Sequence, residues 1–206
     1  MRTELDIYYK ESGKKPRGFT LFQRLYARHI NRLIKRADIG SEQWIELQNK
    51  LANRSASTFD CSLREQFYKH SCKSCGSDIC VLPNVRICYA KNITLGDRVY
   101  INTNTLIVAK AEISIGNDVL IGPNTIINSG MHNYKDAHTA IGKQGHTHKP
   151  IIIEDDVWIG ANVVIMPGVV LGKGCVVGAN SFVNKSVEQY AVVAGSPAKK
   201  ISARIK

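Results

Sequence analysis

The stretch 159–183, "IGANVVIMPGVVLGKGCVVGANSFV", carries an aliphatic residue at every sixth position, namely Ile159, Ile165, Leu171, Val177 and Val183. A helix repeats its apolar face every three or four residues and a strand every two, so a period of six matches neither element alone. Such a period is typical of repeat architectures. The same register continues back to Ile153 and, beyond an interruption, to Leu95.

Each six-residue repeat, or hexad, also has a compact residue at its fifth position and often a glycine at its second. The fifth residue of one hexad and the first of the next are two apart, so on an extended segment they point to the same side. Positions two to four are rich in Gly, Asn and Asp, residues that allow the chain to turn. Short strands and corners therefore alternate and stack into a solenoid. Cys175, in the fifth column, is predicted to be a small core residue.

The composition is that of one globular unit, because 206 residues include 44% hydrophobic and 22% charged residues. The start, "MRTELDIYYKESGKK", lacks the apolar segment of a signal peptide, and no run of about 18 apolar residues follows. We therefore expect a cytoplasmic protein whose six cysteines are mostly reduced. The formal net charge of +11 favours an anionic partner without choosing among phosphate, nucleic acid, acidic glycan and membrane.

The quoted stretch, the preceding "VW" and the closing "AGSPAKKI" resemble the hexapeptide-repeat acetyltransferases, especially the sugar and xenobiotic O-acetyltransferase group. The resemblance covers roughly residues 84–204. It implies a mainly β fold, a left-handed parallel β-helix with three hexads per coil and about four coils after an entry coil from Ile79, assembled as a homotrimer. We accordingly expect a basic, mainly helical segment at 1–78, the β-helix at 79–190 with an extruded loop at 131–150, and a C-terminal tail at 191–206.

The repeat is interrupted at 131–150 by "MHNYKDAHTAIGKQGHTHKP", and loops of this length are usually functional. The resemblance implies that His132 is the general base. A neutral imidazole suits this role because its ordinary pKa of about 6.5 lies near working pH. We expect direct transfer in a ternary complex, with no metal, in which His132 takes the hydroxyl proton and then passes it to the departing thiolate. We interpret His138, His146 and His148 mainly as loop surface.

The resemblance also implies an acceptor pocket. Asn102 matches an asparagine that lines this pocket, although it is also a good turn residue, and Trp158 matches a residue beside the pantetheine and acceptor cleft. The galactoside and maltose enzymes carry an acidic residue where this chain has Ala109 and Lys110. This departure argues against a simple mono- or disaccharide acceptor.

Acetyl-CoA is the co-substrate that the resemblance implies. Ala161 stands where related enzymes often have Ser, and its backbone N–H can still donate to the thioester oxyanion. Basic residues of the tail match positions near the adenosine phosphates, with Arg204 as a neighbour that substitutes for a second one. The complete coenzyme set predicted in this way is Gly160, Ala161, Ala179, Asn184, Lys185, Lys199 and Lys200.

The stretch 18–40, "GFTLFQRLYARHINRLIKRADIG", has the periodicity of an amphipathic helix that Gly40 would end, and Ser41 would cap a second helix. Residues 10–36 carry nine basic side chains against one acidic. One interpretation is that these helices pack on the β-helix or on a partner subunit and keep a solvated basic face. The other is a peripheral surface for an anionic membrane or a lipid-linked, phosphate-bearing glycan at the inner face of the membrane.

Four cysteines, Cys61, Cys72, Cys75 and Cys80, have a spacing that also suits zinc, although a lone C-x2-C pair is a weak signal. Zinc at these thiols therefore remains an open alternative.

We predict an acetyl-CoA-dependent O-acetyltransferase acting on a sugar hydroxyl of a surface polysaccharide, such as capsule, O-antigen or exopolysaccharide. The polysaccharide assignment rests on the loop pattern "HNYKD…IGKQG…KPI", and the partner is a glycan rather than nucleic acid. A xenobiotic, antibiotic or amino-sugar acetyltransferase is the nearest alternative. A trimeric metal enzyme of the carbonic-anhydrase kind needs histidines on adjacent coils, and here they cluster in one loop. A non-catalytic trimer is disfavoured by the presence of His132 and Asn102.

Overall fold

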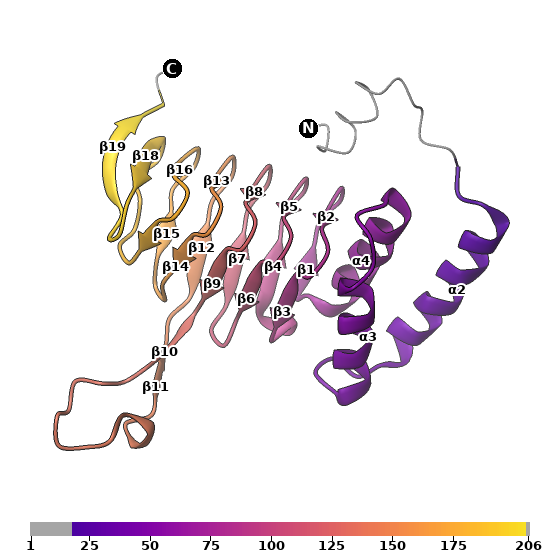
Figure 1. Ribbon diagram of the computed structural model, residues 1–206, viewed down its shortest axis with the longest axis horizontal. Helices are drawn as coiled ribbons and strands as arrows, with labels where there is room; N and C mark the ends of the chain where they lie inside the picture. Colours follow the sequence, from indigo (N-terminus) through magenta and orange to yellow (C-terminus); the bar gives the residue numbers. More distant parts are fainter. Residues whose placement is uncertain (1–17, 205–206) are drawn as a thin grey trace.

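The computed structural model describes residues 18–204, in which a helical segment precedes a long solenoid (Figure 1). The parts of the predicted N-terminal segment and tail at 1–17 and 205–206, including the stretch examined for a signal peptide, lie outside the described residues. The helices are α2 (Leu21–Arg36), α3 (Glu42–Ala52) and α4 (Thr58–Ser71). No helix in the described part of the chain is long and apolar enough to cross a membrane.

Three parallel sheets form the walls of the solenoid. Sheet A contains β1 (Ser74–Cys75), β4 (Ile93–Leu95), β7 (Ile113–Ile115), β12 (Ile151–Ile153) and β15 (Val170–Leu171). Sheet B contains β2 (Cys80–Val81), β5 (Tyr100–Ile101), β8 (Leu120–Ile121), β13 (Trp158–Ile159), β16 (Val176–Val177), β18 (Ala191–Ala194) and the antiparallel β19 (Lys199–Ala203). Sheet C contains β3 (Arg86–Cys88), β6 (Leu106–Val108), β9 (Ile126–Asn128), β14 (Val164–Ile165) and β17 (Phe182–Val183).

Each complete coil takes one strand from each sheet, and the described residues contain five such coils: β1–β3, β4–β6, β7–β9, β12–β14 and β15–β17. A sixth, partial coil follows through the Leu171–Val187 bridge and β18. The predicted parallel β-helix with three hexads per coil is thus confirmed. It begins at Ser74 rather than Ile79, because β1 already pairs with β4.

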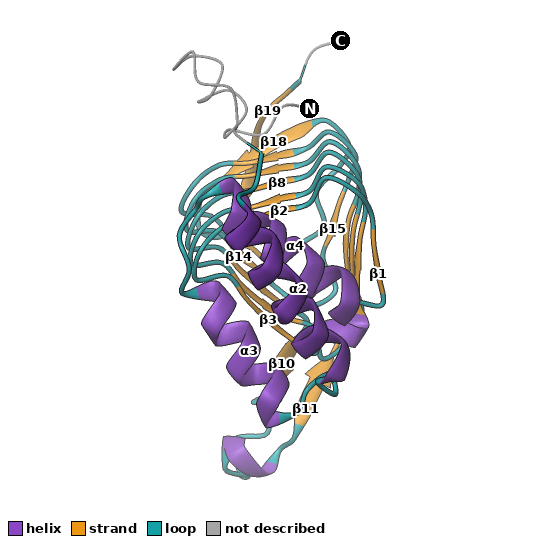
Figure 2. Cartoon of the chain, turned by 90° about the vertical axis from the view of Figure 1, so that its right-hand side faces the viewer, coloured by secondary structure: helices purple, strands orange, loops and turns teal. Residues whose placement is uncertain are grey.

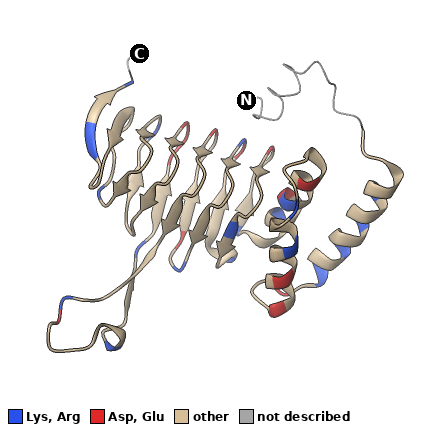
Figure 3. Cartoon of the chain, in the orientation of Figure 1, with Lys and Arg blue, Asp and Glu red and all other residues tan. Residues whose placement is uncertain are grey.

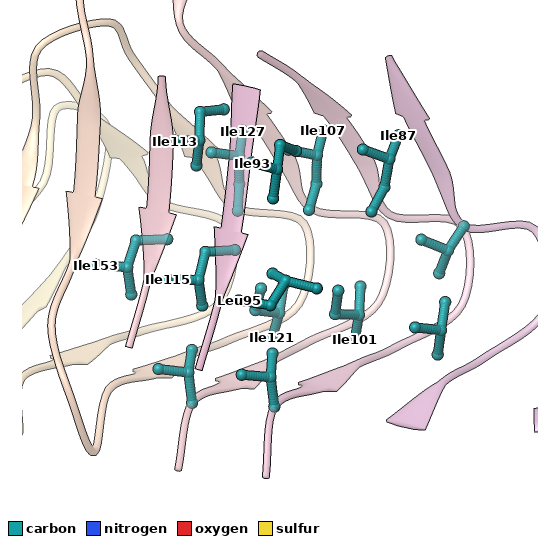
Figure 4. Close-up of a cluster of buried hydrophobic side chains, with 14 of the residues drawn as sticks. Ile87, Ile93, Leu95, Ile101, Ile107, Ile113, Ile115, Ile121, Ile127 and Ile153 are labelled. Carbon is teal, nitrogen blue, oxygen red and sulfur yellow. The ribbon is translucent and has the colours of Figure 1, made fainter. Parts of the chain in front are cut away.

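The first and fifth columns of the repeat fill the interior, as predicted. Figure 4 shows the aliphatic side chains of successive coils stacked on one another, and Ile87, Ile107 and Ile127 are each fully buried. Cys175 is fully buried as well. Each buried aliphatic side chain of this size contributes roughly 1.5–3 kcal/mol relative to an exposed one. The columns therefore hold the coils together.

The corners use two different backbone devices. The fourth position of the hexad has a positive φ, for example 61° at Asn104 and 57° at Asn162, so Asn, Asp and Gly are favoured there. The second-position glycines instead meet the next coil: a Cβ on Gly160 would lie 2.6 Å from the Ala179 backbone nitrogen. Their role is close coil-to-coil approach, whereas the sequence pattern had suggested only turning.

The helical segment departs from the prediction in two ways and agrees with it in one. α2 ends at Arg36 with Ala37 as its C-cap, so Gly40 (φ 95°) lies in the following turn. The predicted cap of α3 is confirmed, since the Ser41 Oγ accepts a hydrogen bond from the Trp44 backbone N–H at 3.3 Å. A third helix, α4, was not predicted because it is buried on several sides and mixes polar with apolar buried residues, among them Asp60 and Arg64.

The helices close the first coil of the β-helix. Arg64, 1% exposed, donates from Nε to the Val81 carbonyl at 2.6 Å and from Nη1 to the Leu51 carbonyl at 3.1 Å. Gln48 Nε2 donates to the Ile87 carbonyl at 2.9 Å. The polar backbone at the end of a solenoid needs such partners, so α3 and α4 serve as the N-terminal cap.

Part of the apolar face of α2 is exposed to solvent. Ile30 and Ile34 are buried, but Leu21, Phe22 and Leu25 are 75%, 77% and 52% exposed. The predicted amphipathic helix is thus present, and only part of its apolar stripe packs on the rest of the chain.

Candidate active site

The triangular cross-section has three corners, which we name by the sheets that they join (Figure 2). The chain turns from sheet A to sheet B at the A–B corner, from B to C at the B–C corner, and from C to the next A strand at the C–A corner. The extruded loop leaves the solenoid at the C–A corner, between β9 and β12 (Figure 2).

The loop has a defined structure at its stem. β10 (Gly130–His132) pairs antiparallel with β11 (His146–His148), and a short 3-10 helix, η2 (Ile141–Lys143), lies near the tip. The Asn133 amide donates to the Gln144 carbonyl at 3.0 Å and its oxygen accepts from Thr147 Oγ1 at 2.6 Å. His132 therefore projects from a hydrogen-bonded hairpin.

Three histidines lie on one face of this hairpin. The antiparallel register places His132 opposite His146, with ring centroids 4.1 Å apart, and the His146 and His148 rings are parallel within 8° at 6.1 Å. Gly130 lies opposite His148, and a Cβ there would be 2.8 Å from His148 Cδ2, so glycine makes room for this imidazole. His146 and His148 are both exposed on the loop surface, and His146 also contacts the predicted base.

The charges around His146 are all of one sign. Desolvation, followed by His132, Lys110 and His148, lowers the pKa of His146 below its ordinary value. Each of these neighbours disfavours a positive charge on the ring. These neighbours therefore favour the neutral form of the His146 ring. His138, in contrast, lies farther along the loop, where its backbone N–H donates to the Asp136 carboxylate at 2.9 Å.

The B–C corner holds a second group of predicted residues. Asn102 and Gly160 occupy equivalent positions of different coils, as shown by their backbone N–H bonds to Ile121 O (2.9 Å) and Val177 O (2.8 Å). Ala161 follows Gly160, and Ala179 occupies the corner of the next coil. Trp158 projects from the outer face of sheet B beside this corner and is 55% exposed. The Asn102 Oδ1 accepts from the Thr103 N–H at 2.7 Å, which orients the side chain.

The remaining predicted residues lie elsewhere. Asn184 and Lys185 directly follow β17, so they lie exposed at the C–A corner. Lys199 and Lys200 are on β19, where Lys200 Nζ lies 2.7 Å from a carboxylate oxygen of Glu188. The Arg204 guanidinium contacts the Asp156 carboxylate at 2.8 Å and the Gly174 carbonyl at 3.1 Å.

One chain does not bring all the predicted residues together. His132, Asn184 and Lys185 are at the C–A corner, Asn102, Gly160, Ala161 and Ala179 are at the B–C corner, and sheet C lies between the two. His146 and Lys110 also lie near the predicted base, and the sequence pattern did not predict this position for either residue. The H-x-H spacing at 146–148 was the available signal, because alternate residues of a strand share a face.

The cysteines do not form a zinc site. All six are free thiols, and no group of three or more His, Cys, Asp or Glu side chains within residues 18–204 is placed to hold a metal ion. The Cys61 Sγ accepts from Arg64 Nη2 at 3.3 Å, and the two buried thiols Cys61 and Cys80 pack with Tyr100.

Comparison with known proteins agrees with this geometry. The family described as "Hexapeptide repeat of succinyl-transferase" matches residues 150–185. The putative colanic acid biosynthesis acetyltransferase WcaF of Escherichia coli (strain K12) is 32% identical over 131 residues, which cover 64% of this chain and 69% of that protein. Galactoside O-acetyltransferase of the same strain is 37% identical over 139 residues, 67% of either chain. Chloramphenicol acetyltransferase of Klebsiella aerogenes is 46% identical, but over 71 residues, only 34% of this chain and 32% of that one.

Solved structures show the same relationship over nearly the whole chain. A hexapeptide-repeat containing acetyltransferase from Vibrio cholerae O1 biovar eltor, complexed with acetyl coenzyme A, has a TM-score of 0.61 at 31% identity and covers 95% of this chain and 96% of its own. A galactoside acetyltransferase in complex with coenzyme A has a TM-score of 0.64 at 29% identity, covering 96% and 90%. The chain therefore belongs to the hexapeptide-repeat acetyltransferases.

Proposed function

We propose that the protein transfers the acetyl group of acetyl-CoA to a hydroxyl of a sugar during the synthesis of a surface polysaccharide, such as a capsule, O-antigen or exopolysaccharide. The observation that carries the proposal is the placement of His132 on a rigid hairpin at a corner of the β-helix. The relatives matched over about two thirds of their length, a colanic acid enzyme and a galactoside enzyme, support a sugar acceptor.

In the proposed mechanism His132 acts as the base. Its neutral imidazole accepts the hydroxyl proton as the acceptor oxygen forms a bond to the thioester carbonyl carbon. The backbone N–H of Ala161 donates to the resulting oxyanion. The carbon–sulfur bond then breaks, and the imidazolium returns the proton to the coenzyme thiolate.

A trimer would complete the site. We propose that three copies pack around a threefold axis so that the C–A corner of one copy faces the B–C corner of the next. The outer face of sheet C, between these corners, supports this arrangement because it carries an apolar row of Leu106, Ile126, Val164 and Phe182, with Ile126 38% exposed. Cyclic assemblies of this kind bury equivalent surfaces on every subunit.

The coenzyme would lie in the groove between the two corners. The small residues Gly160, Ala161 and Ala179 leave the backbone accessible to the pantetheine arm, and Asn184 and Lys185 of the other copy face it. Lys199 is the better phosphate ligand of the tail pair, because Lys200 is already paired with Glu188.

We also propose a cytoplasmic enzyme that touches the inner face of the membrane through α2. Six free thiols suit a reducing compartment. α2 exposes Leu21, Phe22 and Leu25 together with the basic side chains Arg24, Arg28 and Arg32.

Reversing the three arginines to glutamate should abolish sedimentation with vesicles that contain anionic lipid, while wild-type binding should fall as salt rises. Equal binding by both proteins would contradict the membrane contact.

A drug-acetylating enzyme is the second candidate, favoured by the 46% identity to chloramphenicol acetyltransferase over its 71 matched residues. Thiol release from acetyl-CoA should be measured with sugars, nucleotide sugars, amino sugars and chloramphenicol as acceptors, after acetyl-CoA binding has been established by calorimetry. Turnover with a sugar hydroxyl is the expected result. Turnover confined to chloramphenicol or to an amine would replace the proposal, and no acetyl-CoA binding would refute both candidates.

A further inference from the structure

We propose that the acceptor carries a negatively charged group, a carboxylate or a phosphate, which binds between Lys110 and the His146–His148 pair beside His132. This inference rests on the proposed function and names the chemical class of its acceptor. Three features of the charge distribution support it, and a fourth consideration gives it a pH signature.

The C–A corner is basic along the length of the β-helix. Lysines follow the ends of sheet C strands on several coils, and the loop adds more: Lys91, Lys110, Lys135, Lys143, Lys149 and Lys185. The two acidic residues at this corner are already engaged. Glu112 lies 2.8 Å from Lys73 Nζ, and Asp136 accepts from the His138 N–H inside the loop. The corner therefore keeps an excess of positive charge.

The other two corners of the β-helix do not neutralise the excess positive charge of the C–A corner. The A–B corner holds most of the acidic side chains of the solenoid, and Figure 3 shows acidic segments on the loops along the edge opposite the extruded loop. The B–C corner has no charged residue at its turning positions 82–84, 102–104, 122–124, 160–162 and 178–180. A second copy that presents its B–C corner to His132 thus brings no carboxylate from these turns.

Lys110 lies at the base of the hairpin, because the N–H of the next residue, Ala111, donates to the Oγ of Ser129 at 2.9 Å, and Ser129 directly precedes β10. Lys110 is exposed, its Nζ lies 5.6 Å from the Tyr89 ring centroid, and no carboxylate pairs with it in the described part of the chain. Its charge acts on His146, which faces His132 and His148. None of the groups that act on His146 is negative. A bound anion would supply the negative charge that this cluster of side chains lacks.

The cluster also gives the proposal a pH signature. Desolvation, together with the neighbouring His132, Lys110 and His148, holds the pKa of His146 below its ordinary value, and a bound anion would raise it again by stabilising the imidazolium. Binding of a charged acceptor would then take up a proton. The affinity of a carboxylate acceptor, whose own charge is constant in this range, should fall as pH rises from 6 to 8, whereas the affinity of a neutral sugar should not follow this trend.

The test compares a neutral hexoside, the corresponding hexuronate and a hexose phosphate by calorimetry in the presence of coenzyme A. Wild type should bind one or both anions more tightly than the neutral sugar, and which anion binds identifies carboxylate or phosphate as the source of charge. Lys110→Gln and His146→Gln should each weaken anion binding about tenfold, because a charge-assisted contact is lost. Lys173→Gln, at the A–B corner, is the matched control and should leave it unchanged.

The outcomes separate the two proposals. Equal affinity for neutral and charged sugars would overturn the anionic-acceptor inference while leaving sugar acetylation intact. Loss of anion binding in Lys173→Gln, but not in Lys110→Gln or His146→Gln, would do the same. Selective anion binding that depends on Lys110 and His146, without any thiol release, would support the inference and contradict the proposed function. No binding of either anion at pH 6 would also overturn the inference.

Discussion

The B–C and C–A corners of the β-helix differ in how closely they follow the repeat. At the B–C corner small uncharged residues recur from coil to coil, and the backbone approach leaves no room for a Cβ at Gly122 or Gly160. At the C–A corner the turns vary in length, and one of them extends into a hairpin that carries His132. Regular stacking fixes the spacing of the B–C corners, while a departure from the repeat carries the histidine that we propose as the base.

The largest effect should follow from removing the proposed base at the C–A corner. His132→Ala is expected to lower kcat by roughly 10² to 10⁴, the range for a lost general base. Acetyl-CoA affinity, measured by calorimetry, should change little. His138→Ala in the same loop is the matched control and should retain activity. A parallel loss of coenzyme binding in His132→Ala would show that His132 supports structure rather than proton transfer.

A smaller effect, on stability, should follow from disturbing the B–C corner. Gly160→Ala places a Cβ 2.6 Å from the Ala179 nitrogen, so the coils must shift apart. We expect a loss of about 1–3 kcal/mol in the free energy of unfolding, measured by denaturant titration. Gly142→Ala, where a Cβ meets nothing within 4 Å, should cost far less. Equal stability of the two variants would mean that the corner is looser than the coil spacing indicates.

The same contrast explains how much the sequence predicts. The period of six specifies the inward columns and the three sheets, because each hexad supplies one strand and one corner. Counting hexads in threes also assigns Asn102 and His132 to different corners. The close contact of His132 with His146 was not predictable in this way, since it depends on the antiparallel register inside a loop outside the repeat.

The helical segment was harder to predict for a different reason. Helical periodicity shows which residues share a face, but not which face meets the core, so the exposure of Leu21 and Phe22 on α2 could not be read from the pattern. α4 lacks a single apolar stripe because Asp60 and Arg64 are buried in hydrogen-bonded contacts with Ser55, Ser57 and backbone carbonyls. Buried polar networks of this kind hide a helix from pattern analysis.

The central claim is that one active site uses the C–A corner of one copy and the B–C corner of another. Subunit complementation tests it most directly, using His132→Ala and Ala179→Glu, which puts a larger, charged side chain at an exposed B–C position where the pantetheine arm is proposed to lie. Each variant alone should be inactive. Random co-assembly into trimers should restore about a quarter of wild-type activity, because that fraction of interfaces joins two intact corners. Mixed trimers that remain inactive would contradict the claim and place the whole site within one chain.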